Sequence, residues 1–181
     1  MKKTRNPAAA AAAAIAGAGI MLLCIFVPFV SAGEELEDSL DTLTAYEEFG
    51  VDGMDSVSVF KFNTFYYQNS TELFNSSEDG MIYLGLLIAL LVFAVLALVS
   101  TLRRKPVLSL VFGILTLLTF LAEYADFVSR GVVADDAMSY HWSIAFYLCY
   151  VGAALLLAGA IAMLVQKRRQ RRAERQLNTG N

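Results

Sequence analysis

The chain has 181 residues, of which 57% are hydrophobic and 17% charged, and its mean hydropathy is +0.54. A soluble domain carries about a quarter charged residues, so the composition argues against a soluble globular protein. The apolar residues also fall into long blocks between short charged stretches, which is typical of helical membrane proteins.

Four apolar blocks are long enough to cross a bilayer. Each has 22 to 25 residues, and a helix needs about 20 to traverse ~30 Å of hydrocarbon. Helices are expected because a spanning helix satisfies its backbone hydrogen bonds internally. We therefore predict an all-α membrane protein, a four-transmembrane helix bundle. The predicted spans are residues 8–30, 80–102, 107–128 and 141–165.

The first 32 residues have a second interpretation, a cleaved secretory signal peptide. A basic start, an Ala-rich apolar run and the small residues Ser31 and Ala32 fit such a segment. The apolar run of 8–30 is longer than the roughly 7–15 residues typical of a signal peptide, which favours a retained helix. The rest of the topology is the same under both interpretations.

Basic residues gather at one end of the predicted bundle. Of the 17 acidic residues only Glu174 shares that side, which the positive-inside rule assigns to the cytosol. The loops 31–79 and 129–140 are then extracytoplasmic, and both termini are cytosolic. Twelve of the 14 basic residues lie in the three predicted cytosolic segments, 1–7, 103–106 and 166–181.

The outer loop 31–79 is strongly acidic, with 12 acidic residues against Lys61 alone. An amphipathic helix is predicted over 35–49, where three leucines recur at helical spacing among Glu and Asp. After a break at 51–53, the β-branched and aromatic run 57–62 predicts a strand. The loop should therefore form a small mixed α/β unit. The three leucines are Leu36, Leu40 and Leu43.

The charge of this loop has two interpretations. Acidic loops attract divalent cations or basic partners. Alternatively, the acids are a solvated face that keeps the outer side soluble, as charge runs usually are. No EF-hand spacing is present in the sequence.

Repeats of small residues predict that the first and fourth helices touch. Small residues let helix backbones approach closely in lipid, where packing drives association. The alternative is that alanine is only tolerated filler. The predicted packing residues are Ala9, Ala13 and Gly17 in the first helix and Ala154, Ala158 and Ala162 in the fourth.

The only two cysteines, Cys24 and Cys149, lie at similar depth in the first and fourth blocks. A disulfide between them is conceivable if their Cα atoms come within about 7 Å. The alternative is two unreactive thiols, since buried cysteine behaves as a small hydrophobe.

The third span carries polar residues along one face, and two carboxylates near its outer end, Glu123 and Asp126, stand out. Ionisable groups at membrane depth are candidates for function. Together with His141 they could bind a divalent metal ion, or they could form the mouth of an ion or proton path. Alternatively, they are hydrated, paired with Arg130 or Lys61, while the hydroxyls bond to their own helix. The other members of this face are Ser109, Thr116 and Thr119.

The basic tail predicts contact with anionic lipid headgroups, at ~1 kcal/mol per residue near the surface. Alternatively, it is simply the charge cluster that stops transfer after the fourth helix. The predicted headgroup residues are Lys167, Arg168, Arg169, Arg171 and Arg172.

The preferred functional hypothesis is a small membrane protein that acts by association, with its acidic loop presented to a membrane protein partner or to a second copy. The alternative is an oligomeric ion or small-solute transporter or channel subunit. We expect no enzymatic activity, cofactor or nucleic-acid partner, because the sequence carries no convergent catalytic set and its cytosolic segments are too short to fold a domain. The bacterial cytoplasmic membrane is the expected location.

Overall fold

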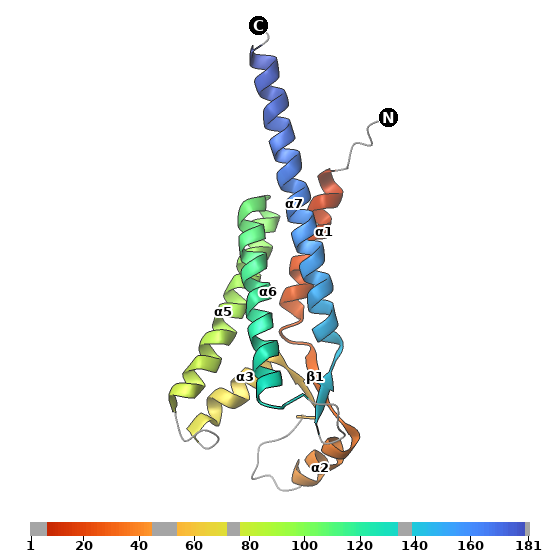
Figure 1. Cartoon of the computed structure of the whole chain (residues 1–181), viewed down its shortest axis with the longest axis vertical. Helices are drawn as coiled ribbons and strands as arrows, with labels where there is room; N and C mark the ends of the chain where they lie inside the picture. Colours follow the sequence, from red (N-terminus) through yellow and green to blue (C-terminus); the bar gives the residue numbers. More distant parts are fainter. Residues whose placement is uncertain (1–6, 45–53, 72–76, 134–138, 180–181) are drawn as a thin grey trace.

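The computed structural model describes residues 7–44, 54–71, 77–133 and 139–179. Long apolar helices run side by side, and a small sheet with two shorter helices covers one end of them (Figure 1). The start of the first helix and the end of the last lie at the opposite end (Figure 1).

Three helices are long and apolar enough to cross a membrane, which supports a helical membrane protein. A fourth apolar helix, α1, is shorter, with 17 residues. α6 packs against both α5 and α7, and α1 packs against α5 and along α7. The bounds are α1 Pro7–Leu23, α5 Ser77–Leu102, α6 Pro106–Ser129 and α7 Ile144–Thr179.

α1 ends at Leu23, earlier than the predicted boundary at residue 30, and the chain then forms strand β1, Pro28–Ala32. Pro28 explains the change, since proline has no N–H to donate and disfavours a helical residue before it. At 1.5 Å per residue, α1 is about 26 Å long. It therefore falls slightly short of the ~30 Å hydrocarbon layer.

β1 is the central strand of a three-stranded antiparallel sheet (Figure 1). It pairs with β2, Ser56–Ser58, on one side and with β3, Tyr140–Trp142, on the other. The mixed outer unit that we predicted within 31–79 therefore also recruits residues from the ends of the first and fourth apolar blocks.

α2, Glu34–Thr44, is the helix that the leucine spacing predicts, and the rest of the predicted range, 45–49, is outside the described residues. The predicted strand 57–62 is wrong beyond Ser58, because helix α3, Val59–Gln68, begins there. Ser58 caps α3 by accepting a hydrogen bond from the Lys61 N–H at 3.1 Å. Tertiary packing of one helical face thus overrides the strand propensity of the sequence.

The contact between α1 and α7 depends on glycine. A Cβ at Gly17 would lie 2.5 Å from the Gly152 carbonyl oxygen, and one at Gly159 would lie 2.6 Å from the Ala14 nitrogen. The backbones therefore meet directly, as small-residue contacts in lipid allow.

The predicted packing residues occupy this contact only in part. Gly17 is buried in it, and Ala13 and Ala162 are partly buried. Ala9, Ala154 and Ala158 are exposed. α7 faces α1 through Gly152 and Gly159, which lie around the helix from the predicted alanines.

Aromatic side chains join the sheet to the helices. The ring of Phe29 in β1 is fully buried and contacts four other rings with centroid distances of 5.7 to 6.1 Å. Such pairs stabilise a core beyond their buried area. The four rings belong to Phe120 and Phe127 of α6, Trp142 of β3 and Phe146 of α7.

Candidate functional site

The hydroxyl groups along α6 bond to nearby helix atoms. Thr116 and Thr119 donate to the carbonyl oxygens of Phe112 and Leu115, at 2.8 and 2.9 Å. Ser109 pairs with the Thr101 hydroxyl of α5. These bonds stabilise the helices themselves and their contact.

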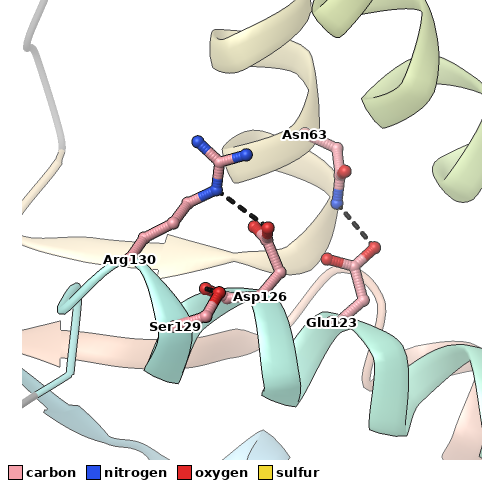
Figure 2. A network of polar contacts seen from close by, with 5 residues as sticks. All are labelled: Asn63, Glu123, Asp126, Ser129 and Arg130. Atoms are coloured by element: carbon pink, nitrogen blue, oxygen red, sulfur yellow. Dashed lines mark hydrogen bonds and ion pairs between the residues drawn. The ribbon is translucent and has the colours of Figure 1, made fainter.

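The carboxyl group of Glu123 is fully buried where α6 meets α3 (Figure 2). Its Oε1 accepts a hydrogen bond of 2.9 Å from Asn63 Nδ2, and Asn63 also donates to the Val59 carbonyl oxygen. Among the described residues, Glu123 Oε2 and Asn63 Oδ1 are buried and have no hydrogen-bond partner. Buried polar atoms without a hydrogen-bond partner are costly, which makes this pair a candidate site rather than an ordinary core contact.

Asp126 lies one turn further along α6 and faces a different partner (Figure 2). Its Oδ1 accepts from Arg130 Nε at 2.8 Å, so the predicted pairing with Arg130 is present. The Arg130 guanidinium also lies over the rings of Tyr66 and Tyr83, 5.6 and 5.0 Å from their centroids. Cation–π contacts of this kind tie the end of α6 to α3 and α5.

His141 is exposed on β3, where it pairs with Ser31 of β1. In the described part of the chain, no group of three His, Cys, Asp or Glu side chains is placed to hold a metal ion. Glu123 therefore bonds to Asn63, and Asp126 bonds to Arg130. The two carboxylates and His141 do not form the metal site considered from the sequence.

A cavity of about 240 Å³ opens in the outer unit beside the sheet. Its lining is mostly apolar and aromatic and includes Leu36, Phe65, Tyr66 and Tyr140. The Tyr140 hydroxyl donates to the Met54 carbonyl oxygen at 2.7 Å. Burial raises the pKa of Tyr140 to about 12, so this donor keeps its proton throughout the physiological range.

Five of the twelve acidic residues of 31–79 lie on α2, at the far tip of the outer unit (Figure 1). Glu34, Glu35, Glu37 and Asp38 are all exposed, and α2 contains no basic residue. On the opposite face of α2, the side chain of Leu40 is buried. Acids in the first turn stabilise a helix through its dipole, but their exposure also leaves a concentrated negative surface.

The tail prediction concerns residues at the other end of the molecule. The five predicted headgroup residues are all exposed on α7, which continues as a helix beyond its apolar part.

Cys24 and Cys149 are both buried and both free thiols.

Sequence reasoning missed Asn63 because it placed the preceding segment, 57–62, in a strand and so did not extend a helical face through residue 63. A helical reading groups Val59, Phe62, Asn63 and Tyr66 on one face, with a single amide among apolar and aromatic residues. An amide in that position is the signal that a buried polar partner faces it.

The fold is mostly helical, with three helices long and apolar enough to cross a membrane and a small mixed α/β cap over one end of its helices. Comparison of the chain with protein-family models, with curated proteins and with solved structures finds no match.

Proposed function

We propose that residues 1–32 are retained and that the chain crosses the membrane four times with both termini in the cytosol. Cleavage after Ala32 would remove α1, which packs along α7, and β1, the central strand of the sheet. Arg103, Arg104 and Lys105 join α5 to α6 at the end opposite the sheet, in agreement with the positive-inside rule. The proposed location is the bacterial cytoplasmic membrane.

Labelling with a membrane-impermeant maleimide tests this topology. Both native cysteines are buried, so introduced cysteines provide the signal. Asp55→Cys in the cap should react in intact cells, and Arg169→Cys on the tail should react only after permeabilisation. Labelling of Arg169→Cys in intact cells would reject the orientation.

We further propose that the protein acts by association and presents α2 to a basic segment of a membrane protein partner. The exposed acids of α2 are the observation that carries this proposal. A helix with exposed acids and no lysine or arginine in its own sequence presents a negative surface, which attracts a positive one over distance.

Carbodiimide crosslinking in native membranes tests the proposal, since this reagent joins a carboxylate directly to a lysine amine in an ion pair. Glu34→Gln with Glu37→Gln should lower the crosslinked fraction about fivefold, as the loss of two exposed ion pairs of about 0.5 kcal/mol each predicts. High salt should have the same effect. The adduct mass distinguishes a second copy from another protein.

Asp55→Asn with Glu78→Gln is the matched control, because it also removes two exposed acids of the outer side, neither of them on α2. It should leave crosslinking unchanged. A protein that stays a solitary monomer, or a control that loses as much crosslinking as the α2 variant, would contradict the proposal.

The second candidate function is an ion or small-solute transporter or channel subunit. Buried Glu123, with one oxygen lacking a partner among the described residues, is the observation that favours it. Glu123→Gln preserves the shape and the bond to Asn63 but removes the ionisable group. Loss of ion flux into liposomes with unchanged folding would support transport, whereas no flux from the native protein would reject it.

A further inference from the structure

At the end of the molecule opposite the sheet, α6 and α7 enclose a groove with a volume of about 380 Å³. Its polar lining is entirely basic, with Lys105 from the start of α6 and Lys167, Arg168 and Arg171 from α7. Four positive side chains around one groove repel one another, and an anion among them relieves that repulsion.

The remaining lining is apolar. Val107 and Leu108 of α6 and Leu164 of α7 form the wall that faces the middle of the helices. Val107 and Leu108 are 56% and 42% exposed. The groove thus has a cationic rim and an apolar wall, an arrangement complementary to a molecule with an anionic head and a hydrocarbon tail.

The backbone of α6 adds to the positive rim. α6 starts at Pro106, and Lys105 at its N-cap makes no side-chain capping bond. The N–H groups of Val107 and Leu108 therefore have no acceptor within the helix, and they lie at its positive end. Amides in this position supplement basic side chains in binding phosphate oxygens.

We propose that this groove binds one anionic phospholipid, with its phosphate among Lys105, Lys167, Arg168 and Arg171 and an acyl chain along the apolar wall. Basic pockets between membrane helices recognise such headgroups. A free phosphate would satisfy the rim but would leave the wall uncovered, so the combined lining favours a lipid. This site is independent of the proposed partner of α2.

Native mass spectrometry of the full chain in mild detergent tests the proposal, with phosphatidylglycerol and phosphatidylcholine of identical acyl chains offered together. One phosphatidylglycerol should be retained in preference to phosphatidylcholine. Lys167→Gln with Arg171→Gln should weaken its binding about 30-fold, as the loss of two contacts each worth about fivefold predicts. A second groove pair, Lys105→Gln with Arg168→Gln, should behave alike.

Arg103→Gln with Arg169→Gln is the matched control, because it removes two exposed charges from the same end of the molecule but neither residue lines the groove. Its phosphatidylglycerol binding should fall less than threefold. Equal loss in this control would mean diffuse attraction by the tail and would overturn the proposal. Equal retention of both lipids, or displacement of phosphatidylglycerol by millimolar inorganic phosphate, would also overturn it.

Discussion

Asn63 and Glu123 form a contact across 60 residues of sequence, between the cap helix α3 and the apolar helix α6. Both side chains are fully buried, and Glu123 accepts its hydrogen bond from Asn63, which also donates to the Val59 carbonyl oxygen. Removal of one partner leaves the other buried without its bond, which costs more than the bond itself contributes. The pair therefore links α3 to α6, whereas α3 packs mainly against α5.

A double-mutant cycle should reveal this dependence. Asn63→Leu should destabilise the protein by about 2 kcal/mol, because Glu123 loses its hydrogen-bond donor. Asn63→Leu with Glu123→Met should cost less than the sum of the single changes, by more than about 1 kcal/mol. Reversible unfolding in detergent measures all four proteins. Additive effects would show that the two side chains do not depend on each other.

α5 and α6 end in the same type of C-terminal cap. At the end of α6 the Gly131 N–H bonds to the Val128 carbonyl oxygen and the Val132 N–H to that of Phe127, with Gly131 at φ 67°. This is a Schellman arrangement, in which the left-handed residue is usually glycine. Arg104, at φ 53°, occupies the same place after α5, where a side chain is strained.

Gly131→Ala should destabilise the protein by about 1 kcal/mol, because a Cβ is unfavourable at that backbone conformation although space for it exists. Gly85→Ala is the control. Gly85 lies within α5 and also has open space around it, so alanine there should be neutral or stabilising by up to about 1 kcal/mol. Thermal unfolding in detergent compares the two. A harmless Gly131→Ala would contradict the assigned backbone conformation.

For the whole molecule, the contact between α1 and α7 decides whether the first apolar segment belongs to the bundle. Packing between membrane helices depends on close backbone approach, because burial from lipid gives no hydrophobic gain. Gly17 lies directly against the backbone of α7, whereas Gly19 faces open space.

Gly17→Ala should therefore destabilise the protein by about 2 kcal/mol, because the new methyl group forces the two backbones apart. Gly19→Ala adds the same methyl group two residues away and should be neutral or slightly stabilising. The midpoint of thermal unfolding in detergent provides the comparison. Equal midpoints for the two variants would indicate that α1 does not pack on α7 in this way.

The sequence by itself determined the properties that depend on local composition. Three apolar blocks of membrane length became α5, α6 and α7, and the leucine spacing after residue 34 became α2. Hydrophobic length and helical periodicity are properties of a continuous segment, so they can be read without knowledge of the fold.

Only the tertiary structure decided which residues face one another. Val59 and Phe62 have strand propensity, but both lie in α3, which packs against α5. β1 exists because β2 and β3 supply its hydrogen-bond partners from distant parts of the chain. The same holds for Glu123, whose hydrogen-bond donor is Asn63 of α3, and for the use of Gly152 rather than Ala154 against α1. Such contacts follow from the complementarity of surfaces far apart in sequence, which no local pattern contains.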